Sequence, residues 1–125
     1  MASDKLIIYQ LLPRLFGNTN TTNKFYGSIE ENGCGKFNDI NEIALREIKG
    51  LGCTHIWLTG CIRQATLTGY PEIGLPADDA DIVKGLAGSM YAISDYYDVC
   101  PDYANEPANR MLEFERLVKH IHDVG

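Results

Sequence analysis

The sequence has few cysteines, and they are not arranged as in the common cysteine-based sites. Four cysteines occur in 125 residues. They form no Cys-x-x-Cys pair, and no histidine stands at zinc-finger spacing from them. Four cysteines in a chain of this length are not a disulfide framework, so we expect free, buried or half-buried thiols and a reducing compartment. These residues are Cys34, Cys53, Cys61 and Cys100.

The sequence also lacks a cluster of basic residues and a long apolar run. Eleven Lys and Arg residues stand against 17 Asp and Glu residues, which gives a formal net charge of -6. Nothing in this balance favours a nucleic-acid partner or an anionic membrane. The apolar run at residues 6–12 is too short to span a membrane, and it lacks the charge order and cleavage site of a signal peptide. We therefore expect a cytoplasmic protein.

The apolar residues predict a parallel strand–helix–strand unit. Residues 5–12 are rich in Leu, Ile and Tyr without alternation, which is typical of a strand buried on both faces. Residues 41–50 predict a helix, and residues 54–58 predict a second short strand. This order implies a parallel unit with a right-handed crossover. The apolar face of the helix is expected to consist of Ile40, Ile43, Ala44, Ile48 and Leu51.

The rest of the chain predicts long loops and one long helix. Residues 17–38 and 66–89 are expected to form loops, because they are rich in polar and turn-forming residues. Residues 91–103 are rich in aromatic side chains, and we expect an irregular segment there. Residues 105–124 predict a helix with Asn105 as its N-cap. Both long loops follow strands, which is where α/β barrels carry their binding residues.

Five blocks of the sequence carry motifs in a characteristic order. Residues 8–16 contain Tyr-Gln and then Arg-x-Phe, and residues 33–40 resemble a Gly-x-Gly-Asp-Leu-x-Gly-Ile stretch. Residues 51–60 contain Leu-Gly followed by Ile-Trp-Leu, and residues 91–99 resemble a Gly-Tyr-x-x-x-Asp-Tyr block. Residues 117–125 end in His-x-x-Gly. Together these blocks resemble the N-terminal part of the catalytic barrel in the α-amylase family of glycoside hydrolases.

The resemblance implies an α/β fold, namely an incomplete TIM (β/α)8 barrel with the first two βα units only. Residues 1–125 would then be the N-terminal piece of the catalytic barrel, since a whole barrel takes about 250 residues. The family acts on α-linked glucans or related oligosaccharides by a retaining mechanism that uses two carboxyl groups. Its nucleophilic Asp, acid Glu and His-Asp pair have no counterpart here. We therefore assign no catalytic residue and expect the isolated chain to be inactive.

Two substrate-binding residues follow from the resemblance. Tyr91 takes the position of the aromatic residue that stacks on the sugar ring at the cleavage point. A flat ring fits the apolar C–H face of a pyranose, and the phenol adds a polar contact. The alternative for Tyr91 is a loop tyrosine packed against the barrel. Asp95 is the second candidate, and the family favours for it a structural role in which its carboxylate accepts loop N–H groups.

No metal site is assigned, and no cofactor is expected. Many members of the family bind calcium near residues 18–23, and calcium is therefore possible in the parent enzyme. Here the loop offers amides, and Lys36 stands where an Asp often occurs, whereas hard cations prefer charged oxygen ligands. His55 and Trp57 belong to the second expected strand, and we expect both to be packed in the core.

Two other interpretations are left open. A non-catalytic carbohydrate-binding or interaction module could use the same part of a barrel, and it predicts sugar binding that is lost in Tyr91→Ala. An unrelated small α/β domain would need a complete sheet, whereas the sequence offers only two convincing strands.

Overall fold

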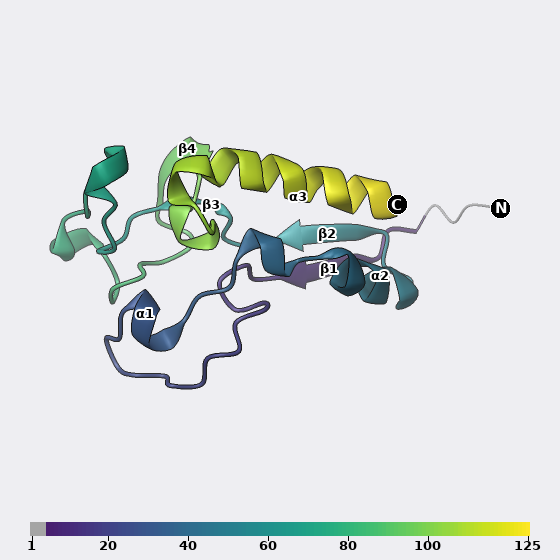
Figure 1. Ribbon diagram of the computed structural model, residues 1–125, viewed down its shortest axis with the longest axis horizontal. Helices are drawn as coiled ribbons and strands as arrows, with labels where there is room; N and C mark the ends of the chain where they lie inside the picture. The colour runs from purple at the N-terminus through teal and green to yellow at the C-terminus, as the bar shows by residue number, and fades with distance from the viewer. Residues whose placement is uncertain (1–4) are drawn as a thin grey trace.

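The computed structural model describes residues 5–125, in which four strands form two separate two-stranded sheets (Figure 1). In the first sheet, β1 (Ile8–Leu11) pairs with β2 (His55–Leu58) in parallel. The helix α2 (Glu42–Gly50) connects the two strands in sequence. The parallel strand–helix–strand unit predicted from the sequence is thereby confirmed.

The second sheet was not predicted. β3 (Ile62–Gln64) pairs with β4 (Ile93–Val99) in antiparallel orientation, so the expectation of an irregular segment at residues 91–103 was wrong. The expectation of only two convincing strands was wrong for the same reason. The register shifts on both sides of Arg63, so two bulge-like irregularities interrupt the alternation that would reveal such a strand.

The helix α2 begins after the N-cap Asn41, and the residues that it buries differ in part from the predicted face. The side chain of Asn41 accepts a hydrogen bond from the backbone N–H of Ala44 at 3.0 Å, which satisfies a free donor of the first turn. The helix buries Leu45 and Ile48. The expected face was therefore wrong in Ile43 and Leu51, which are exposed. Its three other members are Ile40, which is buried just before the helix, the buried Ile48 and the half-buried Ala44.

The last helix, α3 (Arg110–Val124), begins later than the sequence predicted. A 3-10 turn at Pro107–Asn109 precedes it. The buried carboxylate of Glu113 accepts hydrogen bonds from the backbone N–H of Asn105 at 2.8 Å and from that of Glu106 at 2.9 Å. Asn105 is thus held by a side chain from within the helix instead of acting as its N-cap.

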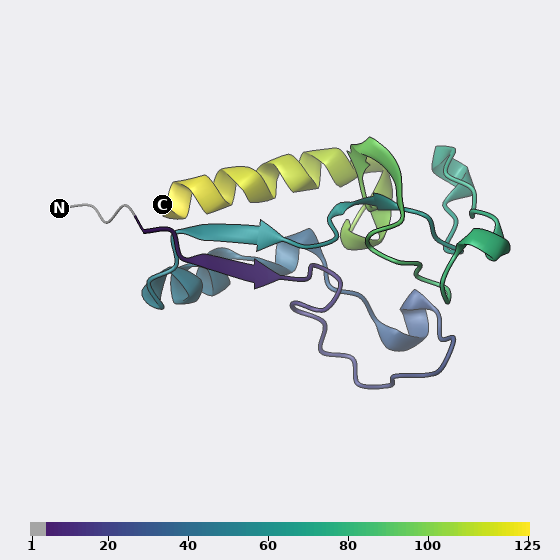
Figure 2. The same cartoon turned by 180° about the vertical axis from the view of Figure 1, so that it is seen from behind.

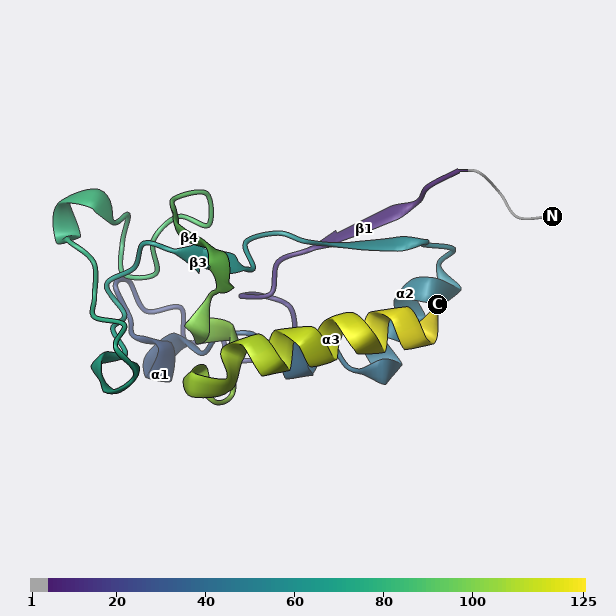
Figure 3. The same cartoon turned by 90° about the horizontal axis from the view of Figure 1, so that it is seen from above.

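Both long helices cover the same face of the β1–β2 sheet (Figure 3). The core lies between the two helices and the sheet, and it includes Leu11, Leu45 and Leu117. On the uncovered face, the side chains of Ile8 and Trp57 are each 55% exposed, and His55 is exposed as well. The predictions of a first strand buried on both faces and of a packed His55 and Trp57 were therefore wrong, because the helices supply only one covering layer.

Long loops extend from the C-terminal ends of β1 and β2 (Figure 2). They contain one short helix, α1 (Ile29–Asn32), and several 3-10 turns. Within the described part of the chain, no helix is long and apolar enough to cross a membrane. The other 3-10 turns are Phe37–Asp39, Pro71–Ile73, Ala80–Ile82 and Pro101–Tyr103.

Candidate functional site

The C-terminal ends of β1 and β2 are joined by side chains as well as by the backbone. Gln10 Nε2 donates a hydrogen bond to Oγ1 of Thr59 at 2.7 Å. The backbone N–H of Thr59 also donates to the carbonyl of Leu11 at 2.9 Å, so the ladder continues past the end of β2. We call this end of the β1–β2 sheet the rim; in α/β barrels, ligands bind at the corresponding ends of the strands.

The tyrosine of the fourth motif block lies beside this rim. Gly60 directly follows the ladder with a φ of +80°, and a β-carbon at Gly60 would come within 2.8 Å of Cβ of Met90. Met90 therefore packs closely against the end of β2, and it places its neighbour Tyr91 there. The side chain of Tyr91 is 79% exposed, and its backbone N–H donates to Oγ of Ser89 at 3.2 Å. Tyr91 is therefore accessible to solvent beside the rim.

Asp95 lies on β4, where it makes structural contacts. Its Oδ1 accepts a hydrogen bond from the backbone N–H of Tyr97 at 2.9 Å. Its Oδ2 lies 3.6 Å from Nη1 of Arg63 on the paired strand β3. These are the contacts expected of the structural role. Among the described residues, no hydrogen bond joins Asp95 to Tyr91. The two candidates therefore belong to one segment of the chain but are not hydrogen-bonded to each other.

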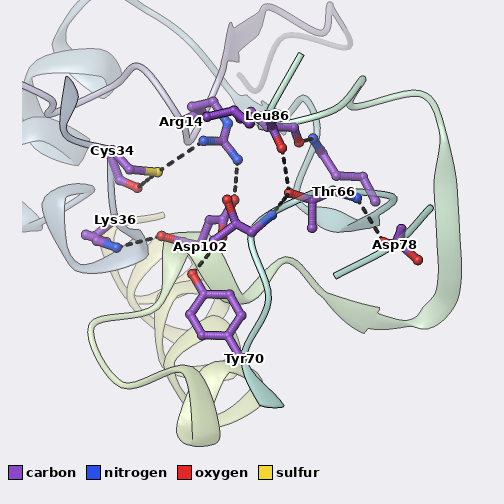
Figure 4. A network of polar contacts seen from close by, with 12 residues as sticks. Arg14, Cys34, Lys36, Thr66, Tyr70, Asp78, Leu86 and Asp102 are labelled. Atoms are coloured by element: carbon purple, nitrogen blue, oxygen red, sulfur yellow. Dashed lines mark hydrogen bonds and ion pairs between the residues drawn. The ribbon is translucent and has the colours of Figure 1, made fainter. Parts of the chain in front are cut away.

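A buried carboxylate connects the two long loops, and the sequence did not indicate it. Asp102 is fully buried, and its Oδ2 accepts a hydrogen bond from Nη2 of Arg14 at 2.5 Å (Figure 4). Its Oδ1 accepts a hydrogen bond from the hydroxyl of Tyr70 at 2.6 Å. Its backbone carbonyl accepts from Nζ of Lys36 at 2.6 Å. We call Arg14, Lys36, Tyr70 and Asp102 the Asp102 network.

The Asp102 network fixes the position of one loop relative to the other. Arg14 and Lys36 belong to the loop after β1, whereas Tyr70 lies in the long loop between β3 and β4, and Asp102 lies in the 3-10 turn after β4. The guanidinium of Arg14 also lies over the ring of Tyr103, 5.2 Å from its centroid. Burial, and then the hydrogen bond and charge of Asp102, raise the pKa of Tyr70 well above its usual value. Tyr70 is therefore a neutral donor at neutral pH.

A second carboxylate cluster joins the β3–β4 sheet to α3. Asp98 binds Arg110 in bidentate fashion, with Oδ1 to Nε at 2.8 Å and Oδ2 to Nη2 at 3.0 Å. Nη1 of Arg63 adds a contact to Oδ2 at 3.3 Å. Burial would raise the pKa of Asp98, but the hydrogen bonds and charge of Arg110 outweigh it, so the pKa is lowered. Asp98 is therefore a structural anion.

The long loop between β3 and β4 is braced internally by Thr66. Its backbone N–H donates to Oδ2 of Asp78 at 2.9 Å, and its hydroxyl donates to the carbonyl of Leu86 at 3.1 Å (Figure 4). Asp78 belongs to an acidic run at residues 78–81, and its carboxylate stabilises the loop through this hydrogen bond. Three segments of this long loop are thereby held together.

The acidic and sulfur-containing groups show no separate reactive centre. In residues 5–125, no group of three or more His, Cys, Asp or Glu side chains is placed to hold a metal ion. The four cysteines are free, two of them buried and two half-buried, as their spacing predicted. Burial raises the pKa of Cys100 to about 12, so its thiol is protonated and unreactive at neutral pH.

Comparisons with protein-family models, with curated proteins and with solved structures found no match to this chain. The case for a function therefore depends on the motif blocks and on the geometry of the rim.

Proposed function

We propose that the chain is the N-terminal segment of a retaining glycoside hydrolase that acts on α-glucans or α-linked oligosaccharides. In this proposal it forms the first two βα units of an α-amylase-type barrel and contributes Tyr91 to the sugar site. The supporting observation is the position of Tyr91, whose ring is 79% exposed beside the C-terminal end of a parallel strand–helix–strand unit. Barrel enzymes bind their substrates at this end of the strands.

The two faces of the β1–β2 sheet support the same proposal. One face is covered by α2 and α3, while the other leaves Ile8 and Trp57 half-exposed. In a barrel, helices cover the outer face, and inward-pointing side chains fill the interior in layers. The uncovered face, which carries Ile8 and Trp57 together with the polar side chains of Gln10 and His55, is therefore the one that would point into a barrel.

The carboxylates of the rim support a binding role without cleavage. Retaining glycosidases need a nucleophile and an acid about 5 Å apart, and both groups must face the sugar. Asp95 is engaged by Arg63, and Asp102 is buried beneath Arg14 and Tyr70. Neither carboxylate is free to act on a bound sugar, so we propose that this chain alone binds sugars but does not hydrolyse them.

Sugar binding by the purified chain tests the assignment of Tyr91 to a sugar site, a result that the non-catalytic binding module also predicts. Maltopentaose is titrated into ¹⁵N-labelled protein, and amide shifts near Tyr91 are followed. We expect Tyr91→Ala to weaken this binding about 3- to 10-fold, the loss of about 0.5–1.5 kcal/mol of stacking, while Tyr91→Phe retains most of it. Tyr97→Ala is the matched control. Tyr97 is 94% exposed on β4, six residues after Tyr91, and its replacement should leave binding unchanged.

Two results would contradict the proposal. The first is an absence of sugar-dependent shifts near Tyr91, and the second is an equal loss of binding in Tyr97→Ala. Release of reducing ends from maltopentaose is measured in parallel. Clear turnover by the pure chain would refute the statement that it binds sugars without cleaving them.

A further inference from the structure

The loop after β1 presents two aromatic side chains to solvent. Phe25 is 86% exposed and Tyr26 is 61% exposed. Their rings lie edge to face, with centroids 4.6 Å apart and an interplanar angle of 86°. Two adjacent exposed rings outside the core form a small apolar surface that a ligand can contact.

The backbone holds this aromatic pair in a fixed turn. Tyr26 has a φ of 54°, a left-handed conformation that is uncommon for a bulky residue. The turn is closed by a hydrogen bond from the N–H of Gly27 to the carbonyl of Lys24 at 3.0 Å. The side-chain amide of Asn32 forms two hydrogen bonds with the backbone of Lys24. Its Oδ1 accepts from the N–H at 2.7 Å, and its Nδ2 donates to the carbonyl at 2.9 Å. The rings are therefore presented on a supported backbone.

A cleft runs from the aromatic pair between the two long loops. One hollow of about 290 Å³ is lined by residues 24–27 and 85–87, together with Asn32. A second hollow of about 230 Å³ shares Gly27, Asn32, Leu86 and Ala87 with the first, so the two adjoin. The second also reaches Arg14 and Asn23. Its walls belong to the loops that the Asp102 network ties together.

The cations of this cleft are already neutralised. Lys24 forms an ion pair with Glu31, and Arg14 forms one with Asp102. Neither of these cations is left unpaired to attract an anionic ligand, which favours a neutral ligand with apolar faces for the two rings. The exposed amide of Asn23 lines the second hollow and would be a partner for hydroxyl groups on such a ligand. Pyranose rings combine these properties, since their C–H faces stack on aromatic rings while their hydroxyls lie at the edges.

We propose that this cleft is a second sugar-binding subsite, with Phe25 and Tyr26 as its stacking platform and Asn23 as a partner for sugar hydroxyls. The ligand is a segment of the α-glucan chain outside the Tyr91 position. The choice of an α-linked glucan depends on the proposed function, whereas the preference for a neutral sugar follows from the cleft itself.

The same titration distinguishes the two sites, because each has its own reporter amides. Maltopentaose should shift the amides of residues 23–27 and 85–87 in the wild-type chain. We expect Phe25→Ala to weaken the sugar affinity reported by these amides at least about 3-fold. The shifts near Tyr91 should persist. Phe25→Trp should retain binding because it keeps an aromatic face. Ile82→Ala is the control, since Ile82 is a 64% exposed apolar residue outside the cleft.

The outcomes separate this subsite from the proposed function. Cleft shifts that are unaffected by Tyr91→Ala support the subsite, even if the region of Tyr91 is silent and the proposed function fails. Shifts near Tyr91 without shifts at residues 23–27 overturn the subsite alone. Shifts at residues 23–27 produced by an apolar peptide but not by maltopentaose also overturn it. Circular dichroism of each variant shows that the fold is intact.

Discussion

Replacing Tyr70 with Phe removes a single hydroxyl and tests whether the Asp102 network holds the loops together. In the wild-type chain that hydroxyl donates to Oδ1 of Asp102 at 2.6 Å, and Asp102 is fully buried. Loss of a hydrogen bond to a charged group costs about 1.5–3 kcal/mol. Tyr70 is only half-buried, so water can partly replace it, and we expect a cost of about 1.5 kcal/mol. For a domain of this size, that corresponds to a decrease in Tm of about 6 °C.

The assay is urea unfolding, followed by circular dichroism and by the fluorescence of Trp57. At an m-value of about 2 kcal/mol/M, the midpoint of Tyr70→Phe should lie about 0.75 M below that of the wild type. Tyr97→Phe is the matched control, because Tyr97 is 94% exposed and its substitution should change stability by less than about 0.5 kcal/mol. Equal midpoints for the two variants would refute a stabilising role for the hydroxyl.

The pH dependence of this difference gives a second, independent check. The pKa of Tyr70 is raised in the folded chain above its usual value of 10.0. A raised pKa favours the protonated hydroxyl in the folded state, so its contribution is complete below pH 10 and is lost as the pH rises above it. Tyr70→Phe carries no such group. The gap in stability between the two chains should therefore narrow above about pH 10, and a constant gap would contradict the assignment.

Three further substitutions test the packing of α2 and the ion pair that anchors α3. Leu45→Ala should cost about 2–5 kcal/mol because Leu45 is buried in the core, whereas Ile43→Ala on the exposed face should cost less than about 0.5 kcal/mol in the same urea assay. Arg110→Gln should destabilise the chain at pH 7 by breaking the bidentate contact with Asp98. The lowered pKa of Asp98 means that its contribution is lost as the pH falls below about 3.8, so the wild type and Arg110→Gln should converge in acid.

The local elements of the first sheet could be predicted because their signals are local. Residues 41–50 carry the N-cap Asn41 and a helical apolar pattern, and the two apolar runs beside them have strand composition. Burial was harder to predict, because it depends on which face is covered. Trp57 has the composition of a core residue, yet it is half-exposed, since both helices lie on the opposite face.

The Asp102 network could not be predicted, because its members are far apart in sequence. Arg14 and Asp102 are 88 residues apart, and Tyr70 and Asp102 are 32 apart. No spacing rule connects positions so far apart, and none of these residues alone indicates its partners in the fold. The aromatic pair was likewise not predicted. The sequence carries one signal for it, because Phe25 and Tyr26 are adjacent aromatic residues in a polar loop.

Arg14 belongs to the first motif block, to the Asp102 network and to the lining of the cleft. The contacts of its guanidinium show which role it can have. It belongs to the Arg-x-Phe motif and lines the cleft, so direct recognition of a ligand is the first role to consider. However, its Nη2 is bound to Asp102, its Nη1 contacts Sγ of Cys34 at 3.8 Å, and its plane lies over Tyr103. A guanidinium held on these sides has little freedom to follow a ligand. Its role is therefore to position the two loops, while the exposed aromatic rings of those loops are left free to bind.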